Sequence, residues 1–489
     1  MKKIIGLVII IVALVLASYY GMGYLTERTL KKDFARINQN NGMSVDVKYY
    51  QRALFSANAM LHVHLHIPER SVTNASGETT MLDAEDYDLD IPLTIYHGPI
   101  IFADSNIRFG FGYAVTDISL PPNLTEKFNN LFTNDSNKPQ LHFALFVNYF
   151  NDTYLDVNIP KFTLNAKQGN NHVEWLGLLS QVKLSPNLVD VDGNINLTGI
   201  NVSKEQNKIS LGKISSKYDL HMDTIGLYIG TADFDLQSMQ IFSGNVKLLE
   251  IDNFQLKSSS DIKDNLFNSS ANLSLTKYMN DGYEYGPGYF DIAVKNIDAK
   301  TLVDLNQKLN TMQQSAPDWQ QGLFLVFSEL PKLFAHGTEL EIKRLNLIMP
   351  EGELSGNLLL NVPANKANNP FQVIQSLQGT AHLQIPTEIV KNLISIMVKH
   401  NLQASVNLQQ AMIQQLQKTQ NKSNSTVNSN VDTIGLEQMV ASQTNQKLQA
   451  LQESGLLVLK DNYYIIDINL KDGQFIINGK PFDASMFPF

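Results

Sequence analysis

The chain of 489 residues contains no cysteine. Disulfide bonds, cysteine nucleophiles, iron–sulfur clusters and cysteine-ligated zinc are therefore excluded. The stability of the chain has to come from packing and hydrogen bonding.

Basic residues are also scarce. The chain has 38 Lys and Arg against 47 Asp and Glu, which gives a formal net charge of −9, and basic residues never occur in runs longer than two. Proteins that bind nucleic acid present a basic patch to the phosphate backbone. We therefore expect no nucleic-acid partner.

Familiar catalytic signatures are missing as well. The sequence contains no Gly-x-x-x-x-Gly-Lys-Ser/Thr loop, no Gly-x-Ser-x-Gly elbow, no His-Glu-x-x-His motif and no Gly-x-Gly-x-x-Gly motif. We expect a protein that is not an enzyme and holds no cofactor. The alternative is a hydrolase whose site is assembled from residues far apart in the sequence.

A long uncharged stretch begins near the N-terminus. Lys2 and Lys3 precede it, and no charged residue occurs between Ile4 and Thr26. At about 1.5 Å per residue, a helix of this length crosses the roughly 30 Å hydrocarbon core of a bilayer. We predict a transmembrane anchor over residues 1–26. The alternative is a cleaved signal peptide, because residues 15–17 resemble a cleavage site.

The two lysines also predict the orientation of this anchor. Cytoplasmic flanks of membrane spans carry the excess of Lys and Arg. We therefore expect a single-pass inner-membrane protein with a cytoplasmic N-terminus and a periplasmic body, for which the membrane is one partner.

Two-residue alternation of apolar and polar side chains dominates residues 27–300, for example at 60–67, 193–198 and 272–276. This period is typical of half-buried antiparallel strands. Turn pairs such as Glu351-Gly352 and Asn478-Gly479 punctuate the later strands. We predict a mainly β fold with some α, built on a long antiparallel and curved sheet that ends in a C-terminal hairpin.

Helical spacing interrupts the alternation in the mixed α/β region 301–489. It occurs near 301–334, 387–417 and 434–451, and predicts three or four amphipathic helices. In the second of these, the predicted apolar face carries Ile389, Leu393, Ile396 and Met397. A Ser/Asn/Gln tract at 418–430 predicts a flexible loop, because it has too few apolar residues to repay the entropy of ordering.

Three histidines at alternate positions, His62, His64 and His66, form the most conspicuous polar cluster. On a strand they share one face with neighbours about 6 to 7 Å apart. The other face carries Leu61, Val63, Leu65 and Ile67 and is the natural core face. We interpret the histidines as a solvent-facing stripe, with a metal site on an adjacent pair as the alternative.

Asp86, Asp88 and Asp90 superficially match the start of a calcium loop. However, Ile91 occupies the sixth position, where such a loop needs glycine, and His97 occupies the twelfth, where it needs Glu. We reject an EF-hand and interpret the aspartates as the wet face of another strand.

Aromatic residues occur on both faces of the segment 143–150, more than a one-sided sheet needs. One interpretation is a strand buried on both faces. The other is an apolar groove for acyl chains or a partner. For that groove we predict two sets of lining residues, namely Phe143, Leu145, Val147 and Tyr149 in one segment, and Leu323, Val326 and Phe327 in another.

Four segments resemble the bacterial YdgA family of uncharacterised proteins. They are residues 50–56, the His97-Gly98-Pro99 tripeptide after Tyr96, residues 288–298 and residues 473–480. Two positions depart from the family pattern, Ala53, where glycine is expected, and Tyr96, where an acidic residue is common. The resemblance implies a Gram-negative envelope protein anchored in the inner membrane with a periplasmic β-rich body, and it supplies no catalytic residues.

The same order of an anchor and a long β meander is similar to the AsmA-like envelope proteins, which form curved sheets with lipid-lined grooves. His97-Gly98-Pro99 itself is typical of a strand end, because Pro99 lacks an amide donor. A catalytic role for His97 has no Ser, Asp or Glu partner at a recognisable spacing.

These observations predict a non-enzymatic, membrane-anchored envelope protein that binds lipid in an apolar groove of its sheet. The alternative partner is another envelope protein, for which the sheet would be a scaffold. A role outside the cell is neither supported nor refuted by the sequence.

Overall fold

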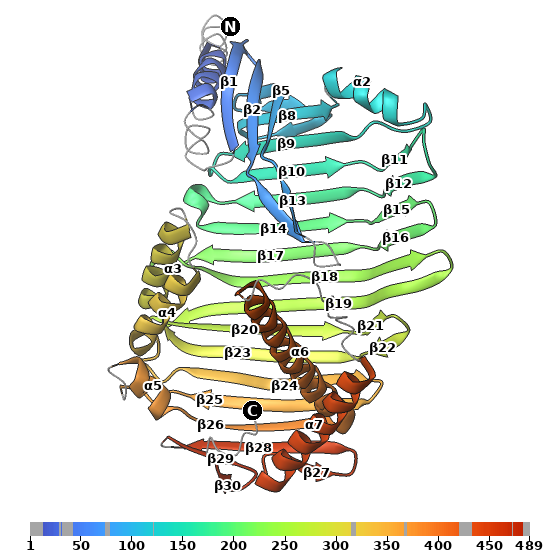
Figure 1. Ribbon diagram of the computed structural model, residues 1–489. Coiled ribbons are helices and arrows are strands. Elements are labelled where there is room, and N and C mark those ends of the chain that lie inside the picture. The colour runs from blue at the N-terminus through green and yellow to red at the C-terminus, as the bar shows by residue number, and fades with distance from the viewer. Residues whose placement is uncertain are drawn as a thin grey trace, which may run out of the picture. The chain divides into compact units, whose positions relative to one another are not determined.

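The computed structural model describes residues 13–28, 31, 43–73, 79–120, 122–313, 319–365, 369–419, 433–471 and 473–482. They are mainly antiparallel β structure with seven helices, and the chain divides into two compact units (Figure 1). The first unit comprises residues 1–224 and 228–250, and the second comprises residues 225–227 and 251–489.

Unit 1 is built on a ladder of antiparallel strands. Its strands in order of pairing are β1 (Met43–Arg52), β2 (Ser56–Ile67), β5 (Glu85–His97), β8 (Gly110–Ser119), β9 (Gln140–Asn148), β10 (Thr153–Ile159), β13 (Leu178–Leu184), β14 (Asp190–Leu197), β17 (Ile214–Met222) and β18 (Tyr228–Ser243).

After short breaks in the chain, a second row of strands extends the first row. It comprises β11 (Phe162–Asn165), β12 (Asn171–Trp175), β15 (Ile200–Lys204) and β16 (Asn207–Leu211), which pairs with the end of β18. Smaller elements of unit 1 are β3 (Arg70–Thr73), β4 (Thr79–Leu82), β6 (Ile101–Ala103), β7 (Asn106–Arg108), α2 (Pro122–Leu131) and the short 3-10 turn η1 (Pro186–Leu188).

Unit 2 repeats the antiparallel pattern and adds helices. Its strands are β19 (Val246–Lys263, whose first residues belong to unit 1), β20 (Leu266–Leu275), β21 (Lys277–Asn280), β22 (Tyr283–Tyr285), β23 (Gly288–Asp298), β24 (Glu339–Met349), β25 (Gly352–Asn361), β26 (Gln378–Pro386), β27 (Val458–Lys460), β28 (Tyr463–Lys471), β29 (Gln474–Ile477) and β30 (Lys480–Pro481). Its helices are α3 (Ala299–Gln313), α4 (Trp319–Leu333), α5 (Pro370–Ser376), α6 (Thr387–Thr419) and α7 (Thr433–Ser454).

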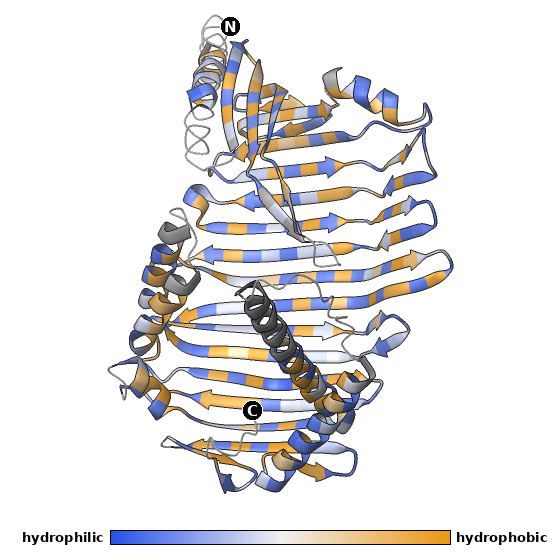
Figure 2. Ribbon diagram, in the orientation of Figure 1, coloured by the Kyte–Doolittle hydropathy of each residue, from blue (hydrophilic) through white to orange (hydrophobic). Residues whose placement is uncertain are grey.

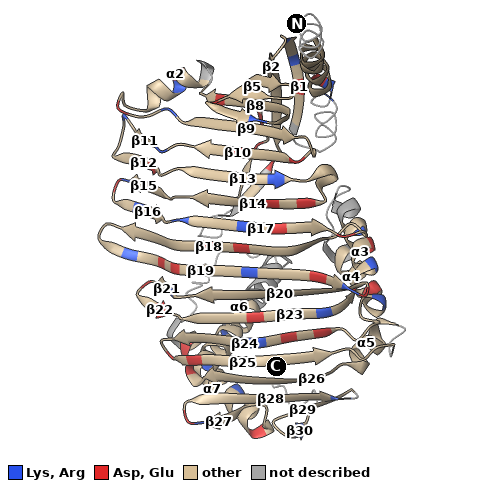
Figure 3. Cartoon of the chain, turned by 180° about the vertical axis from the view of Figure 1, so that it is seen from behind, with Lys and Arg blue, Asp and Glu red and all other residues tan. Residues whose placement is uncertain are grey.

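Hydropathy alternates along the strands of both units, as the sequence predicts (Figure 2). Acidic and basic residues are interspersed along the strands, and the residues that the structure describes form no basic block in this view (Figure 3). The largest buried cluster of unit 1 lies where β1, β2, β5 and β8 pair, and it includes Ala59, Leu61 and Ile95. In unit 2, α6 and α7 pack on β28 through a cluster that includes Val398, Leu451 and Tyr464.

The predicted transmembrane anchor is wrong. Residues 13–28 form a helix that packs on unit 1 with Tyr19 and Gly23 buried. Among the residues that the structure describes, no helix has the length and apolar character needed to cross a membrane. The prediction rested on the absence of charge, whereas the helix uses one face for packing against strands.

The predicted helical regions correspond to α3, α4, α6 and α7, and the structure adds α2, α5 and the helix at 13–28. The predicted boundary at residue 300 marks where α3 begins, whereas the compact units divide near residue 250. In the predicted loop 418–430, the first two residues belong to α6 and the others lie outside the described residues.

The apolar face predicted for α6 is also wrong in part. The structure buries Val390, Ile394 and Val398, whereas Leu393 and Ile396 are exposed. Apolar residues occur around much of this helix, so periodicity does not identify the side that packs on the sheet.

The core of unit 1 predicts a large difference between two isoleucines. We expect Ile95→Ala, at a side chain that is 1% exposed, to lower the free energy of unfolding by about 2–5 kcal/mol because it leaves a cavity. The matched change Ile107→Ala, at a side chain that is 60% exposed, should change it by less than about 0.5 kcal/mol. Urea unfolding of both variants tests this, and equal losses would contradict the assignment of the core.

Candidate functional site

The outer part of the β2–β5 pair forms an arm, which we define as residues 60–67 paired with residues 85–92, and β1 flanks residues 60–65 on the other side of β2. The pairing runs from Met60 opposite Pro92 to Ile67 opposite Glu85. Side chains alternate between the two faces of such a ribbon. One face of the arm is therefore polar and the other is apolar.

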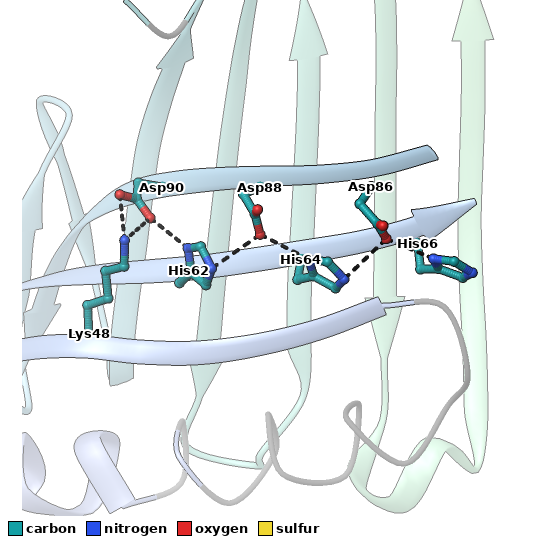
Figure 4. A network of polar contacts seen from close by, with 7 residues as sticks. All are labelled: Lys48, His62, His64, His66, Asp86, Asp88 and Asp90. Carbon is teal, nitrogen blue, oxygen red and sulfur yellow. Dashed lines mark hydrogen bonds and ion pairs between the residues drawn. The ribbon is translucent and has the colours of Figure 1, made fainter. Parts of the chain in front are cut away.

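The polar face carries a chain of alternating histidines and aspartates (Figure 4). Register places His62 opposite Asp90, His64 opposite Asp88 and His66 opposite Asp86. The Nδ1 atoms lie 2.9, 2.9 and 2.7 Å from the Oδ1 atoms of these respective partners. We call this set of six side chains the His–Asp ladder.

Diagonal contacts connect the rungs of the ladder. His62 Nε2 lies 3.3 Å from Asp88 Oδ1, and His64 Nε2 lies 3.5 Å from Asp86 Oδ1. At the inner end, Lys48 Nζ of β1 donates to both carboxylate oxygens of Asp90, at 2.6 and 2.7 Å. All of these groups are open to solvent, so their pairwise contributions to stability are small.

The contacts shift the pKa values in opposite directions. The hydrogen bond to Asp88 raises the pKa of His64 above its ordinary value of 6.5, and the same bond lowers the pKa of the Asp88 carboxyl. Lys48, followed by His62, lowers the pKa of Asp90. The Asp88 carboxylate thus stabilises the protonated form of His64.

Metal binding competes poorly with this arrangement. A carboxylate on Nδ1 ordinarily leaves Nε2 as the metal ligand, but here Nε2 of His62 and of His64 also faces an aspartate oxygen. Within the described part of the chain, no group of three or more His, Cys, Asp or Glu side chains has the arrangement that could hold a metal ion.

The sequence predicts both halves of the ladder on the wet faces of strands, and the structure agrees. The pairing of the two halves was not predicted. A signal for it was present, because three histidines and three aspartates alternate at equal spacing on two segments that an antiparallel hairpin brings into register.

The apolar face of the arm points to the same side of the sheet as an extended row of apolar residues. Leu61, Val63 and Ile91 of the arm pack in one cluster with Leu145 of β9. Farther out, Leu65 and Tyr87 are opposite each other and are 40% and 48% exposed. The outer half of the arm therefore presents uncovered apolar surface.

From Leu145 the apolar row continues in register across six strands, β9, β10, β13, β14, β17 and β18. We call it the apolar strip, and its large side chains are Phe143, Leu145, Val147, Leu155, Val157, Val182, Leu184, Val191, Ile195, Tyr218, Leu220 and Phe234.

The opposite face of the same strands is polar. One row across it contains Asp156, Gln181 and Lys217. The side chains of the apolar strip are only half-buried, and that of Ile195 is 39% exposed. Among the described elements of unit 1, no helix covers β13, β14 or β17 (Figures 1 and 3).

The predicted groove residues fall in both units. Phe143, Leu145 and Val147 lie on the apolar strip, and Tyr149 follows β9, with its hydroxyl donating to the carbonyl of Pro99. In unit 2, α4 carries Leu323, which is 57% exposed, Val326, which packs against the core, and Phe327, whose ring lies 5.8 Å from that of Phe371. The two sets belong to different units, and their union in one groove stays a prediction.

The structure also explains His97-Gly98-Pro99. His97 ends β5 and is 1% exposed beneath the helix at 13–28. Neither ring nitrogen makes a hydrogen bond of normal geometry, although backbone groups of Ser56 and Tyr19 lie near the ring. Burial is the main cause that lowers the pKa of His97, and the nearby Arg52 guanidinium lowers it further; backbone groups of Ser56 and Tyr19 oppose the shift only in part. The sequence does not reveal the helix as the partner of this tripeptide.

The His–Asp ladder predicts a pH response for one histidine. His64 should titrate above 6.5, so its contact with Asp88 is fully present below pH 6.5 and is lost as the pH rises through the raised pKa. We expect Asp88→Asn to move the pKa of His64 down towards 6.5, measured by NMR titration of labelled histidines.

Asp117→Asn is the matched control, because Asp117 contacts His142 at 2.8 Å on a different strand pair. It should leave His64 unchanged. A His64 that titrates at 6.5 in the unaltered chain would show that the ladder does not form in solution.

Comparison with known proteins identifies one relationship. Residues 1–485 match the model of a family described as "Bacterial protein of unknown function (DUF945)". Neither the curated proteins nor the solved structures include a significant match.

Proposed function

Because the chain belongs to the DUF945 family of bacterial proteins of unknown function, we propose its function from the site alone: it binds lipid, and the apolar strip of unit 1 receives the acyl chain. No catalytic residue and no cofactor takes part. A closer relationship to the YdgA family and a place in the cell envelope are parts of the same proposal. The resemblance of residues 50–56, 97–99, 288–298 and 473–480 supports them.

The half-buried apolar strip is the observation that carries the proposal. Soluble proteins rarely leave a large contiguous apolar patch uncovered unless it binds something. The strip is continuous because its rows are in register, for example Leu145, Leu155 and Val182 on three successive strands. A ligand that covers it removes this surface from water, at roughly 25 cal/mol per Å².

The dimensions of the strip suit a long ligand. Neighbouring strands lie about 4.8 Å apart, so six strands span about 24 Å across the sheet. One leaflet of a bilayer, half of its roughly 30 Å hydrocarbon core, is only about 15 Å deep. A whole acyl chain therefore fits along the strip.

The chemistry of the strip favours an acyl chain over a polar ligand. Its middle row consists of Leu145, Leu155, Val182, Gly193 and Tyr218, with the Tyr218 ring lying over Gly193. None of these side chains carries a charge. The apolar face of the arm lies on the same side of the sheet and adds Leu65 and Tyr87 as exposed apolar surface.

A pair of leucine substitutions tests the proposal. Leu155 lies in the middle of the strip, whereas Leu179 lies on the opposite face of the sheet and is 56% exposed. We expect Leu155→Asp to remove most of the phospholipid that co-purifies with the full chain, measured by mass spectrometry. Leu179→Asp should retain it.

Stability distinguishes a lipid surface from a sealed core. A carboxylate on a half-open surface keeps part of its hydration, so Leu155→Asp should cost less than the several kcal/mol of an unpaired charge in a closed interior. If the chain carries no lipid and Leu155→Asp unfolds it, the strip is a packed surface and the sheet is a scaffold for another protein. Equal lipid content in both variants would also refute the proposal.

A further inference from the structure

The helix at 13–28 is seated on a defined feature of unit 1, which we call the His-Gly-Pro corner and define as His97, Gly98 and Pro99. Tyr19 of the helix is 7% exposed. Its hydroxyl donates to the carbonyl of Ile100 at 2.5 Å, and its ring meets the Phe55 ring edge to face at 4.8 Å. The contact therefore combines apolar packing with a directed hydrogen bond.

Two glycines make the fit possible. Gly98 has a φ of +127°, and a Cβ at this position would lie 1.9 Å from the Tyr19 ring. A Cβ on Gly23 of the helix would lie 2.6 Å from Cε1 of His97. The Tyr19 ring thus occupies the space over Gly98, and the His97 ring occupies the space over Gly23. Gly21, two residues earlier in the helix, has no atom near the position of a Cβ.

The guanidinium group of Arg52 in β1 contacts the helix. It lies 4.9 Å from the centre of the Tyr20 ring and 5.8 Å from that of Tyr24. It also lies 3.6 Å from a carboxylate oxygen of Glu27. A positive charge over aromatic rings at these distances is attractive.

The buried imidazole of His97 is the group through which protonation would destabilise this contact. No carboxylate is paired with either ring nitrogen of His97, so a second proton on the ring would leave a buried cation that only the backbone groups of Ser56 and Tyr19 could stabilise. The groups that act on it directly are the Arg52 guanidinium and the backbone of Ser56 and Tyr19, and Arg52 in turn lies near Glu27 and Tyr50.

The backbone groups of Ser56 and Tyr19 offset a charge on His97 only in part, because burial has the larger effect. Glu27, near Arg52, carries a negative charge, but Arg52 and Lys31 already contact it, Lys31 at 2.8 Å. Arg52 repels an imidazolium. The Tyr50 hydroxyl is buried without a partner, and burial raises its pKa to about 12, so it stays neutral.

We propose that the helix at 13–28 is a pH-released latch, and that protonation of His97 unseats it from the His-Gly-Pro corner. The direction of the pH effect follows from the difference in the pKa of His97 between the seated and the released state. Burial keeps the pKa of seated His97 below 6.5, whereas the released ring titrates near 6.5. The released state therefore binds more protons below pH 6.5, and seating weakens as the pH falls through that region.

The latch lies beside the proposed lipid site but does not depend on it. The Tyr149 hydroxyl donates to the carbonyl of Pro99, and Tyr149 follows directly on β9, which carries Phe143, Leu145 and Val147 of the apolar strip. Release of the helix would uncover the Phe55 ring that Tyr19 contacts, which is already 54% exposed.

The absence of cysteine allows a direct test on the full chain. Leu25 on the helix and Ser119 at the end of β8 are exposed, so Leu25→Cys and Ser119→Cys can carry two spin labels. At pH 7.5 we expect one narrow distance between the labels. At pH 5.0 a second, broad distribution should appear, and His97→Gln should abolish this change. An unaltered distribution at pH 5.0, or a response that persists in His97→Gln, would overturn the latch.

Two alanine substitutions keep the test decisive if His97→Gln fails to fold. Gly23→Ala and Gly21→Ala improve the helix propensity equally, but Gly23→Ala alone places a methyl against the imidazole. Gly23→Ala should show the released distribution already at pH 7.5. Gly21→Ala should stay seated at pH 7.5 and release at pH 5.0. A Gly23→Ala chain that stays seated would also overturn the proposal.

Discussion

Antiparallel pairing in register is the constraint on which the rest of this protein depends. Successive side chains of a strand point to opposite faces. The register places apolar side chains beside apolar ones, and polar beside polar ones, on the neighbouring strand. Leu155 therefore lies between Leu145 and Val182, while Asp156 lies beside Gln181. A slip of one residue would exchange the faces and put charge on the apolar strip.

The same constraint brings opposite charges together on the arm. His64 and Asp88 are far apart in the sequence and meet because the hairpin register places them opposite each other. Each partner stays hydrated, so the contact shifts pKa values without a large cost of burial. The Asp88 carboxylate thus favours the charged form of His64 at the surface.

His97 shows the reverse effect with the same side chain. It lies in the interior beneath the helix, where burial disfavours an imidazolium and the backbone groups of Ser56 and Tyr19 compensate only in part. Burial lowers its pKa, whereas an exposed carboxylate raises that of His64. One chain therefore contains histidines shifted in both directions, and their surroundings alone account for the difference.

Much of the fold, though less of the site, could be predicted from local patterns along the chain. Residues 60–67 and 86–91 each alternate with a period of two, and the polar faces of His62 and Asp90 follow from these patterns. Their contact does not follow, because it depends on which strand is the neighbour. The anchor predicted over residues 1–26 failed for a related reason: the absence of charge does not reveal that the helix packs on Gly98 and His97.

Composition and neighbours along the chain are enough to specify the antiparallel β character, the absence of cysteine chemistry and the apolar side of each strand. They do not specify which strands pair, which histidine is buried, or which apolar residues remain uncovered on the apolar strip. On α6, for example, Ile394 is buried and the adjacent Leu393 is exposed, although both are apolar. Burial and pairing depend on groups that are distant in the sequence, and only folding brings those groups within contact distance.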